Sequence, residues 1–372
     1  MSRRPVPRPI GPVRSTGPTR YSDGPPRWVP WSVAISSALY GHGGFFHRPE
    51  GPAGHFRTSV HASPLFATAV IALLESVDVS LGRPERLDLV DVGAGSGELL
   101  VAVLTQLTDP AAYPGLTGRV HLHAVELADR PQGLPEAISW SAELPEGVVG
   151  LLVANEWLDN VPVDVVEAGP DGVHRVLVDP AEGAESPGGP AGLRDAGWLA
   201  QWWPLDGAPE GARAEVGFPR DVAWASAVRS LERGLAVMID YGHLRAARVA
   251  GEYEAGTLRG YRGGRLVTPV PDGSCDLTAH VAVDACAAAG LRAGAVESRL
   301  LRQGEALRHL GIEHSQVRPR ADRTAEQRPS AAADLEHASQ VAELTAPNGL
   351  GAFWWLLQSV GGPIPPLARR SV

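Results

Sequence analysis

The sequence predicts an α/β fold in which a doubly wound, mostly parallel sheet carries an inserted region. Short apolar runs alternate along the chain with segments of helical periodicity, a pattern typical of a parallel sheet covered by helices on both faces. The chain of 372 residues is long enough for one enlarged domain or two. A stretch rich in Gly, Pro and Ala interrupts the pattern and indicates that the extra length is an insertion.

The N-terminal segment, residues 1–30, is expected to be disordered. Residues 1 to 27 are rich in Pro, Arg and Gly and contain almost no apolar side chains. Further along, apolar side chains at helical spacing predict a helix over residues 63–77. A buried strand, a helix and three further apolar strands are then expected, in that order, at Leu87–Val92, Glu98–Leu107, Val120–Val125, 151–154 and 235–239.

The insertion is expected to begin with a β-hairpin over residues 163–180 that turns at Pro170-Asp171-Gly172. A Gly- and Pro-rich loop should follow over residues 181–215, and a second hairpin should begin at Gly256. After the disordered tail, residues 31–160 are predicted to form an N-terminal segment and the cofactor-binding half of the core. Residues 161–220 form the insertion. Residues 221–372 form the remainder of the core, with the second hairpin and the C-terminal helices and strands.

Composition excludes several functional classes. The net charge of −9 argues against a general nucleic-acid-binding protein, and no run of 18 apolar residues predicts a membrane span. The two cysteines cannot form a disulfide framework, so a reducing cytoplasm is expected. All 33 basic residues are arginine, which together with the abundant Ala, Gly and Pro indicates a GC-rich bacterial genome.

Three alternating glycines mark a ligand site. The segment "LVDVGAGSG" places Gly93, Gly95 and Gly97 where the first buried strand passes into a helix. In a parallel sheet this is the carboxyl end of a strand, where ligands bind. Glycine permits positive φ there and lets a ligand approach the backbone closely.

The spacing of these glycines distinguishes two cofactor classes. A dinucleotide requires G-x-G-x-x-G, but Glu98 occupies the last position of that motif and its carboxylate would repel a pyrophosphate. The pattern is instead acidic-x-G-x-G-x-G, beginning at Asp91, which is typical of methyltransferases that use S-adenosylmethionine (SAM). SAM carries no phosphate, and Asp91 can attract its ammonium group.

Glu126 ends the next strand, "RVHLHAVEL". A carboxylate at this place can accept hydrogen bonds from both ribose hydroxyls of an adenosine cofactor, although this would suit NAD equally. Ser141 and Trp140, after the third strand, are candidates for contacts with the adenine ring, and core packing is the alternative for Trp140.

The segment "LLVANEWLDNVP" places acidic side chains beside the expected methyl group, at the end of another strand. Asn155 is predicted to contact the cofactor, and Glu156 and Asp159 are predicted to be catalytic. A guanidinium is planar and always charged, and it matches a carboxylate in bidentate geometry, so these carboxylates suit an arginine substrate. Trp157 could line the substrate pocket. The alternative is that Glu156 merely ends a strand and that Asp159 caps a turn.

Several motifs in order resemble the MidA-like SAM-dependent methyltransferases, a family that includes the mitochondrial complex I assembly factor that methylates an arginine. They are "YGHGGFFHRPEGPAGHFRTSVHASPLF", "VDVGAGSGELL", "VANEWLDNVPVD", "MIDYG", "GTLRGYRGGRLV", "DLTAHV", "QGEALRHLGI" and "GLGAFWWLLQS", and they span roughly residues 31–362. The resemblance implies a class I, Rossmann-like methyltransferase core with SAM as cofactor. It also implies a protein substrate, such as a subunit of a respiratory or other complex, and we expect a homodimer.

The resemblance extends to further pocket residues. Asp240 and Tyr241 in "IDYG" are expected to line the substrate pocket, and Asp276 and His280 in "DLTAHV" to approach the substrate.

The sequence also departs from the family's usual pattern. The T-S-P-E-I-S segment here reads "TSVHAS", residues 58–63, so that Val60 and His61 replace a proline and a glutamate, and Ser96 replaces a common arginine in the glycine loop. Thr58 and His61 are candidate pocket residues, and the loss of the glutamate raises the alternative of a different substrate.

The sequence also bears on metal binding and on functions other than arginine methylation. The histidines His42, His47, His55 and His61 fit no familiar ligand spacing, so no metal site is predicted. Alternatives to arginine methylation are methylation of a small molecule or of another side chain, and a non-catalytic assembly factor that retains the fold. The intact glycine motif and acidic residues favour catalysis.

Overall fold

The computed structural model describes residues 28–47, 59–314 and 331–367. The predicted disorder of residues 1–27 and the candidate residues Thr58 and His55 lie outside these ranges. Trp28 to Pro30, which the sequence placed in the tail, are described. Val29–Pro30 form the short strand β1, which pairs with a strand of the insertion.

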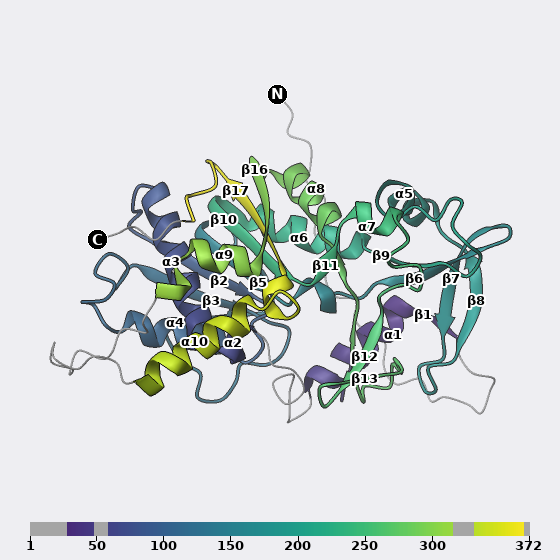
Figure 1. Cartoon of the computed structure of the whole chain (residues 1–372), viewed down its shortest axis with the longest axis horizontal. Coiled ribbons are helices and arrows are strands. Elements are labelled where there is room, and N and C mark those ends of the chain that lie inside the picture. The colour runs from purple at the N-terminus through teal and green to yellow at the C-terminus, as the bar shows by residue number, and fades with distance from the viewer. Residues whose placement is uncertain (1–27, 48–58, 315–330, 368–372) are drawn as a thin grey trace.

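A seven-stranded sheet forms the centre of the molecule (Figure 1), in the order β16-β17-β10-β5-β2-β3-β4. β17 is antiparallel to both of its neighbours, and the pairs from β10 to β4 are parallel. The predicted doubly wound, mostly parallel sheet is therefore confirmed. The chain reverses its direction of travel across the sheet between β2 and β5, and ligands bind at such a switch point. The strands are β2 (Leu87–Val92), β3 (Val120–Val125), β4 (Ile138–Ser141), β5 (Val148–Asn155), β10 (Leu231–Asp240), β16 (Glu297–Arg302) and β17 (Trp354–Val360).

Helices cover both faces of this sheet. Because side chains alternate along a strand, Leu89 packs with one layer of helices while Val90 packs with the other. The first layer holds α3 (Pro64–Ser80), α4 (Glu98–Leu107), α9 (Gln303–His309) and α10 (Ala331–Thr345), with the short α2 (Ser59–Ala62) beside them. The second layer holds α6 (Phe218–Ser230) and α8 (Val283–Ala293).

Local signals explain why the predicted helix at residues 63–77 begins where it does. The Ser63 hydroxyl accepts a hydrogen bond from the Leu65 amide at 3.0 Å and so caps α3, and Pro64 takes the first helical position. The structure extends this helix to Ser80, slightly beyond the predicted end.

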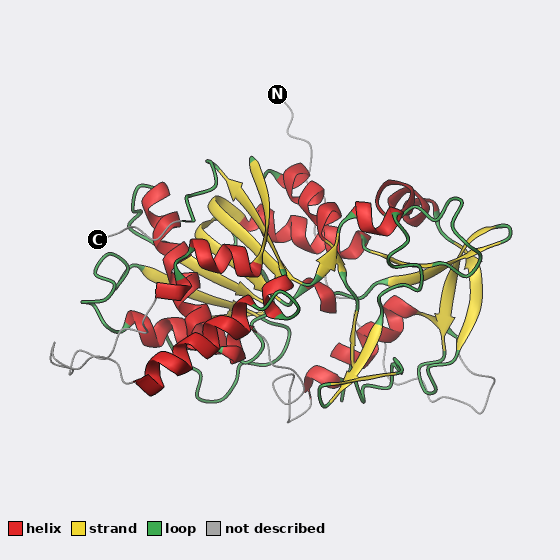
Figure 2. Ribbon diagram, viewed as in Figure 1, coloured by secondary structure: helices red, strands yellow, loops and turns green. Residues whose placement is uncertain are grey.

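A second sheet, on the right in Figure 2, is built around the insertion. The predicted hairpin is confirmed: β6 (Asp164–Gly169) pairs with β7 (Gly172–Val178), and Gly169 faces Gly172 across the turn. The predicted loop over residues 181–215 is wrong. That stretch contains β8 (Glu185–Pro190), α5 (Leu193–Trp202) and β9 (Arg213–Val216), which pair with or pack against the hairpin. Tertiary contacts override the weak local propensity of its Gly- and Pro-rich residues.

Segments distant in sequence join this second lobe. Helix α1 (Trp31–Tyr40) packs through Trp31 and Ile35 against β6, β7 and β14, rather than with the cofactor half in which the sequence placed it. The second predicted hairpin is confirmed and also lies here, as β12 (Arg259–Arg262) and β13 (Arg265–Val267). The remaining short elements are η1 (Phe45–His47), η3 (Leu158–Asn160), β11 (Gly242–His243), α7 (Arg245–Val249), β14 (Asp276–Thr278), β15 (Val281–Ala282), η4 (Ile312–His314) and η5 (Leu350–Ala352).

The helices described above are short or amphipathic. None within residues 28–47, 59–314 and 331–367 is both long and apolar enough to cross a bilayer.

Candidate active site

The glycine loop joins β2 to α4 and adopts a conformation that only glycine accepts readily. Gly93, Gly95 and Gly97 have φ values of 74°, 59° and 87°. A Cβ atom on Gly93 would lie 2.8 Å from Cδ1 of Trp157, and one on Gly97 would lie 2.8 Å from Cδ1 of Leu134. Backbone conformation and close packing therefore both require glycine in this loop.

Three carboxylates surround the loop. Burial, together with the charges of Glu98 and Glu126, raises the pKa of Asp91 to about 7. Glu126 ends β3 as predicted. Its Oε2 accepts a hydrogen bond from the Gly95 amide at 3.1 Å, and its Oε1 accepts one from the Leu127 amide at 2.7 Å. The loop is therefore surrounded by carboxylates, which favour a cationic ligand and repel a pyrophosphate.

The end of β4 lies beside Glu126. The Ser141 carbonyl accepts a hydrogen bond from the Glu126 amide at 2.9 Å. The indole of Trp140 donates to the Ala128 carbonyl at 3.0 Å and packs against the core, while its ring edge reaches Gly97. Trp140 therefore packs in the core and also borders the glycine loop.

His61 belongs to α2, and its side chain contacts the first residue of α4, Glu98. Its Nε2 is 3.5 Å from Oε1 of Glu98, which in turn accepts a hydrogen bond from the Ser96 amide at 3.0 Å. The residue that departs from the family pattern is therefore next to the glycine loop.

Glu156 follows β5 in a strained backbone conformation, with φ of 51°. Its amide donates to the Ile239 carbonyl at 2.8 Å, which fixes it across the switch point. Its Oε1 accepts hydrogen bonds from the Ser59 amide and from Nδ2 of Asn155, both at 3.3 Å. Burial and the charge of Asp159 raise the pKa of Glu156 to about 8.

Asp159 is held inside a hydrogen-bond network. Its Oδ2 accepts from the Thr278 hydroxyl at 2.8 Å and from the Tyr241 hydroxyl, and its Oδ1 accepts from Nδ2 of Asn160 at 3.0 Å. Burial raises its pKa, and these hydrogen bonds oppose the shift. Asp159 thus positions Tyr241, and its contact with a substrate stays a prediction.

Asp240 stabilises the turn that carries Asp159. It is fully buried, and its Oδ2 accepts the amides of Leu158 and Asp159 at 3.1 and 3.2 Å. Burial and the charge of Asp159 raise its pKa well above the usual range. Asp240 therefore caps the turn that carries Asp159, whereas the sequence placed it in the substrate pocket.

Two segments of the second lobe, α1 and β14, and helix α6 of the core complete the site. Tyr40, at the end of α1, donates to the Asn160 carbonyl at 3.1 Å, and burial raises the pKa of its hydroxyl. Arg220 on α6 is buried and donates to the carbonyls of Asp159 and Ala279 at 2.6 and 2.9 Å. Asp276 on β14 is buried, and its Oδ1 has no hydrogen-bond partner among the described residues.

Sequence reasoning missed Tyr40 and Arg220. Tyr40 opens the first segment that resembles the MidA-like family, which was the available signal. Arg220 had none, because a single arginine in a helix gives no indication that it faces inward. Asp276 and His280 had been predicted only through the resemblance. The ring of His280 packs edge-on against Tyr241, with centroids 5.3 Å apart.

Comparisons with known proteins assign the family. The model of the family described as "Putative S-adenosyl-L-methionine-dependent methyltransferase" matches residues 67–300. The chain belongs to this family. No curated protein sequence matches it.

Two solved structures are similar to this methyltransferase along nearly its whole length, and both come from Burkholderia thailandensis. One is "a COG1565 superfamily member and likely methyl transferase" bound to S-adenosyl-homocysteine, with 26% identity, a TM-score of 0.73 and 92% of each chain covered. The other, a native structure of a COG1565 superfamily protein, has 25% identity and a TM-score of 0.72, and covers 92% of this chain and 91% of its own. The MidA-like resemblance, the class I methyltransferase fold and SAM as cofactor are confirmed.

The residues of this methyltransferase fit that cofactor. Asp91 and Glu126 would face the ammonium and ribose groups of SAM, and the bare glycine backbone leaves room for it. When bound, SAM supplies a methyl group on a positively charged sulfonium. The carboxylates around the loop would stabilise that charge, and a nearby cation would oppose the shift by which burial and the charges of Glu98 and Glu126 raise the pKa of Asp91 to about 7.

Glu126 offers a direct test of ribose binding. Glu126→Ala is expected to weaken SAM binding by about 1.5–3 kcal/mol, the range for hydrogen bonds to a charged acceptor. Isothermal titration calorimetry would measure the change, with the exposed Glu136→Gln as a control. Unchanged affinity would mean that another group holds the ribose.

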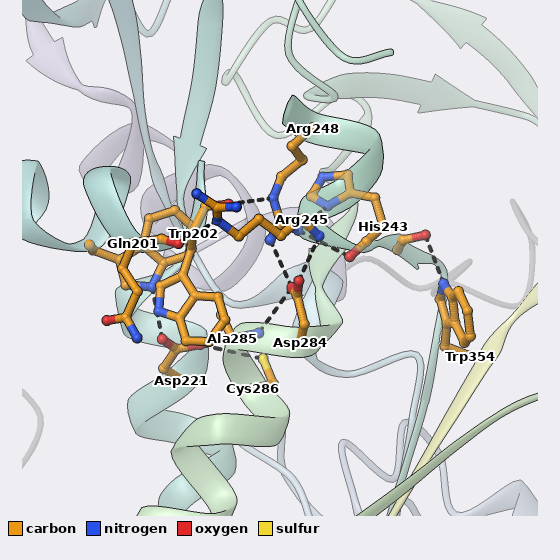
Figure 3. A network of polar contacts seen from close by, with 12 residues as sticks. Gln201, Trp202, Asp221, His243, Arg245, Arg248, Asp284, Ala285, Cys286 and Trp354 are labelled. Atoms are coloured by element: carbon orange, nitrogen blue, oxygen red, sulfur yellow. Dashed lines mark hydrogen bonds and ion pairs between the residues drawn. The ribbon is translucent and has the colours of Figure 1, made fainter. Parts of the chain in front are cut away.

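A buried arginine network in the methyltransferase ties the acidic site to the second lobe (Figure 3). Arg248 donates to Oδ1 of Asp284 at 2.7 Å and to the Trp202 carbonyl at 2.8 Å, and it contacts Nδ1 of His243 at 2.9 Å. His243 follows Asp240 and Tyr241 closely in the chain. The network therefore fixes the segment on which those site residues lie.

The sequence predicts no metal site, and the described residues can be searched for one. Within the described part of the chain, no group of three or more His, Cys, Asp or Glu side chains could hold a metal ion. His42 is exposed, and His61 faces Glu98.

Proposed function

We propose that the methyltransferase transfers a methyl group from SAM to an ω-nitrogen of an arginine in a protein substrate. The observation that carries this proposal is the pair of carboxylates at Glu156 and Asp276. Burial raises the pKa of Glu156 to about 8 and the pKa of Asp276 to about 7. The negative charge of Asp276 also contributes to the shift of Glu156. Neither side chain has an ion-pair partner among the described residues.

Neighbouring cations do not neutralise this pair. The buried arginine of the site, Arg220, donates its guanidinium hydrogen bonds to backbone carbonyls. Two buried carboxylates without a counter-ion are costly, so they favour a cationic ligand that enters from outside. A guanidinium is the cation that remains charged at any physiological pH and that can bond to two carboxylates at once.

Trp157 connects this pair to the cofactor. It is the next residue after Glu156, and its ring carbon lies against Gly93 of the SAM loop. A guanidinium held by Glu156 would therefore lie close to the loop that binds SAM. Alignment of one nitrogen with the sulfonium methyl, and exclusion of water, would supply most of the rate. Glu156 and Asp276 hold the substrate in this proposal, and Asp159 orients Tyr241 beside them.

The remaining parts of the proposal concern the cellular setting. We propose a cytoplasmic bacterial enzyme that acts as a homodimer. The MidA-like resemblance makes subunits of respiratory complexes the first candidate substrates.

The raised pKa of Glu156 predicts a pH dependence. A carboxylate with its pKa raised to about 8 is largely protonated at pH 7 and gains its charge as the pH rises. Because only the charged form pairs with a guanidinium, kcat/KM for methyl transfer should increase from pH 7 to 9 and then level off. Glu156→Gln should flatten this rise. An unchanged profile in the variant would assign the pH dependence to another group.

The substrate class can be determined directly. Extracts of cells that lack the enzyme would be incubated with the purified protein and SAM carrying an isotopically labelled methyl group, and the peptides analysed by mass spectrometry. We expect the label on arginine side chains of one or a few proteins. Label on lysine, on a carboxylate or on a small molecule would contradict the arginine proposal. SAM binding without any transfer would favour a non-catalytic assembly factor.

A further inference from the structure

A groove lies on the outer surface of the molecule, between α5, α6 and α8. It has a volume of about 370 Å³ and does not include any residue of the acidic site. Its floor is aromatic and apolar, with Trp198, Trp202 and Phe218 beside small alanines of α6 and α8. Trp202 and Asp221, which line this groove, lie close to the Arg248 network in Figure 3. The volume is in the range of ligand-binding sites.

The charged side chains along this groove are mainly arginines: Arg194, Arg229 and Arg292. Asp221 is the one acidic residue among those that line it, and its carboxylate is occupied. Its Oδ2 accepts from the Trp198 indole at 2.8 Å, and its Oδ1 contacts Sγ of Cys286 at 3.6 Å. Asp221 therefore does not offer a hydrogen-bonded ion pair to the arginines.

Little else within the described structure neutralises these arginines. Arg292 lies close enough to Asp221 for its charge to lower the pKa of that carboxyl, but no hydrogen bond or ion pair joins Arg292 to a described residue. Arg229 donates only to the Ser226 hydroxyl, at 3.1 Å. Arg194 pairs with Oδ1 of Asp195 at 3.3 Å, and Arg175 binds Oδ2 of the same carboxylate at 2.8 Å, so one negative charge serves two arginines. In a chain of net charge −9, this groove is a local concentration of positive charge.

The spacing of the arginines indicates the size of the ligand. The guanidinium of Arg194 stacks on Phe218, 4.8 Å from the ring centroid, at one end of α6. Arg229 lies near the other end of the same helix, and the intervening lining residues are Asp221, Val222 and Ala225, all on one helical face. Three turns of α-helix separate Phe218 from Arg229, roughly 16 Å. A single compact anion cannot reach both ends, whereas about five residues of extended peptide span that length.

We propose that this groove binds an acidic segment of a partner protein. Carboxylates of the segment pair with the three arginines, and apolar side chains between them pack on the tryptophan floor and on Val222, which is 46% exposed. The charge of the groove is opposite to that of the catalytic site, so the two sites select different chemical groups. The inference does not require the partner to be the substrate that is methylated.

A selection from a randomised peptide library tests this proposal. Twelve-residue peptides would be displayed against the full chain and, in parallel, against the double variant Arg229→Glu/Arg292→Glu. We expect enriched peptides that combine Asp or Glu with Leu, Ile or Phe on the unmodified protein and not on the variant. A fluorescein-labelled enriched peptide should bind at least tenfold more weakly to the double variant by fluorescence anisotropy, and added salt should also weaken binding.

A matched variant separates local from general charge effects. Arg265→Glu also reverses an exposed charge, but on β13 and outside the groove, and it should leave peptide binding unchanged. Calorimetry with SAM would show that all variants remain folded. Equal loss in the control variant, or enriched peptides without acidic residues, would overturn the proposal. Self-association of the protein that disappears in the double variant would instead identify a second copy of the chain as the occupant, and would overturn it as well.

Discussion

Gly95→Val is expected to abolish SAM binding, with a loss of at least about 100-fold, or about 2.8 kcal/mol. Gly95 is exposed at the tip of the loop, has φ of 59°, and donates its amide to Glu126. A branched side chain would fill the space in front of the backbone, strain the loop and displace the carboxylate that faces the ribose. Calorimetric titration with SAM would measure the loss.

The control for Gly95→Val must produce the same backbone strain at a position outside the SAM site. Gly207 meets this requirement, because its φ is 75° and a Cβ atom there would have no neighbour within 4 Å. Both substitutions should lower the melting temperature by similar amounts, whereas only Gly95→Val should lose SAM. Full SAM affinity in Gly95→Val would remove the glycine loop from the cofactor site.

Glu156→Gln is expected to reduce methyl transfer at least tenfold while stabilising the protein at high pH. The loss of one tenfold factor in rate corresponds to only 1.4 kcal/mol of transition-state alignment, which removal of a charged hydrogen-bond acceptor readily exceeds. Gln retains an oxygen to accept the Ser59 and Asn155 hydrogen bonds, so the local structure should persist. Single-turnover transfer from labelled SAM would measure the effect.

The stabilising effect follows from the direction of the pKa shift. Folding raises the pKa of Glu156 from 4.5 to about 8, so the folded protein favours the protonated side chain. Its contribution to stability is full below pH 4.5 and is lost as the pH rises through 8. The neutral variant avoids this loss, by about 1.4 kcal/mol for each pKa unit as an upper limit. Its melting temperature should therefore exceed that of the unmodified protein at pH 9 and differ little at pH 4.

An exposed acidic residue provides the comparison. Glu136→Gln removes a charge from the surface and should change neither transfer nor melting temperature. If Glu156→Gln retained full transfer with intact SAM affinity, Glu156 would be structural and the arginine proposal would lose its main support. A lower melting temperature at pH 9 would show instead that the charged side chain is stabilised in the fold.

Much of the cofactor half could be predicted from sequence, because local signals agree there. The run at Leu87–Val92, the glycines that follow it and the helix Glu98–Leu107 were placed with the bounds that the structure gives. Apolar periodicity and the conformational freedom of glycine act within a few residues, so a single sequence carries them. The stretch Glu185–Pro190 lacks such signals, since its strand forms only through backbone pairing with β7.

The acidic site shows where sequence reasoning reaches its limit. The carboxyl ends of β5 and β10 could be predicted to bring Glu156 and Asp240 together, because parallel strands end at one edge. The different surroundings of these two carboxylates could not be predicted from the sequence. Asp240 is a buried cap whereas Glu156 remains without a cation, and this depends on the positions of backbone amides. Tyr40 reaches the site only because α1 of the second lobe folds against the core, and Arg220 reaches it because one side of α6 faces the turn at Asp159.

The order of strands has a consequence for protein synthesis. β17, at Trp354–Val360, lies between β10 and β16 and follows both of them in the chain. Until β17 has left the ribosome, the edge of β10 that it covers is unpaired and apolar side chains are exposed. Nascent chains should therefore remain vulnerable to aggregation and dependent on chaperones until β17 has been made and released. Proteolysis of stalled chains would test this, because chains that end before Trp354 should be digested rapidly and released chains that contain β17 should resist.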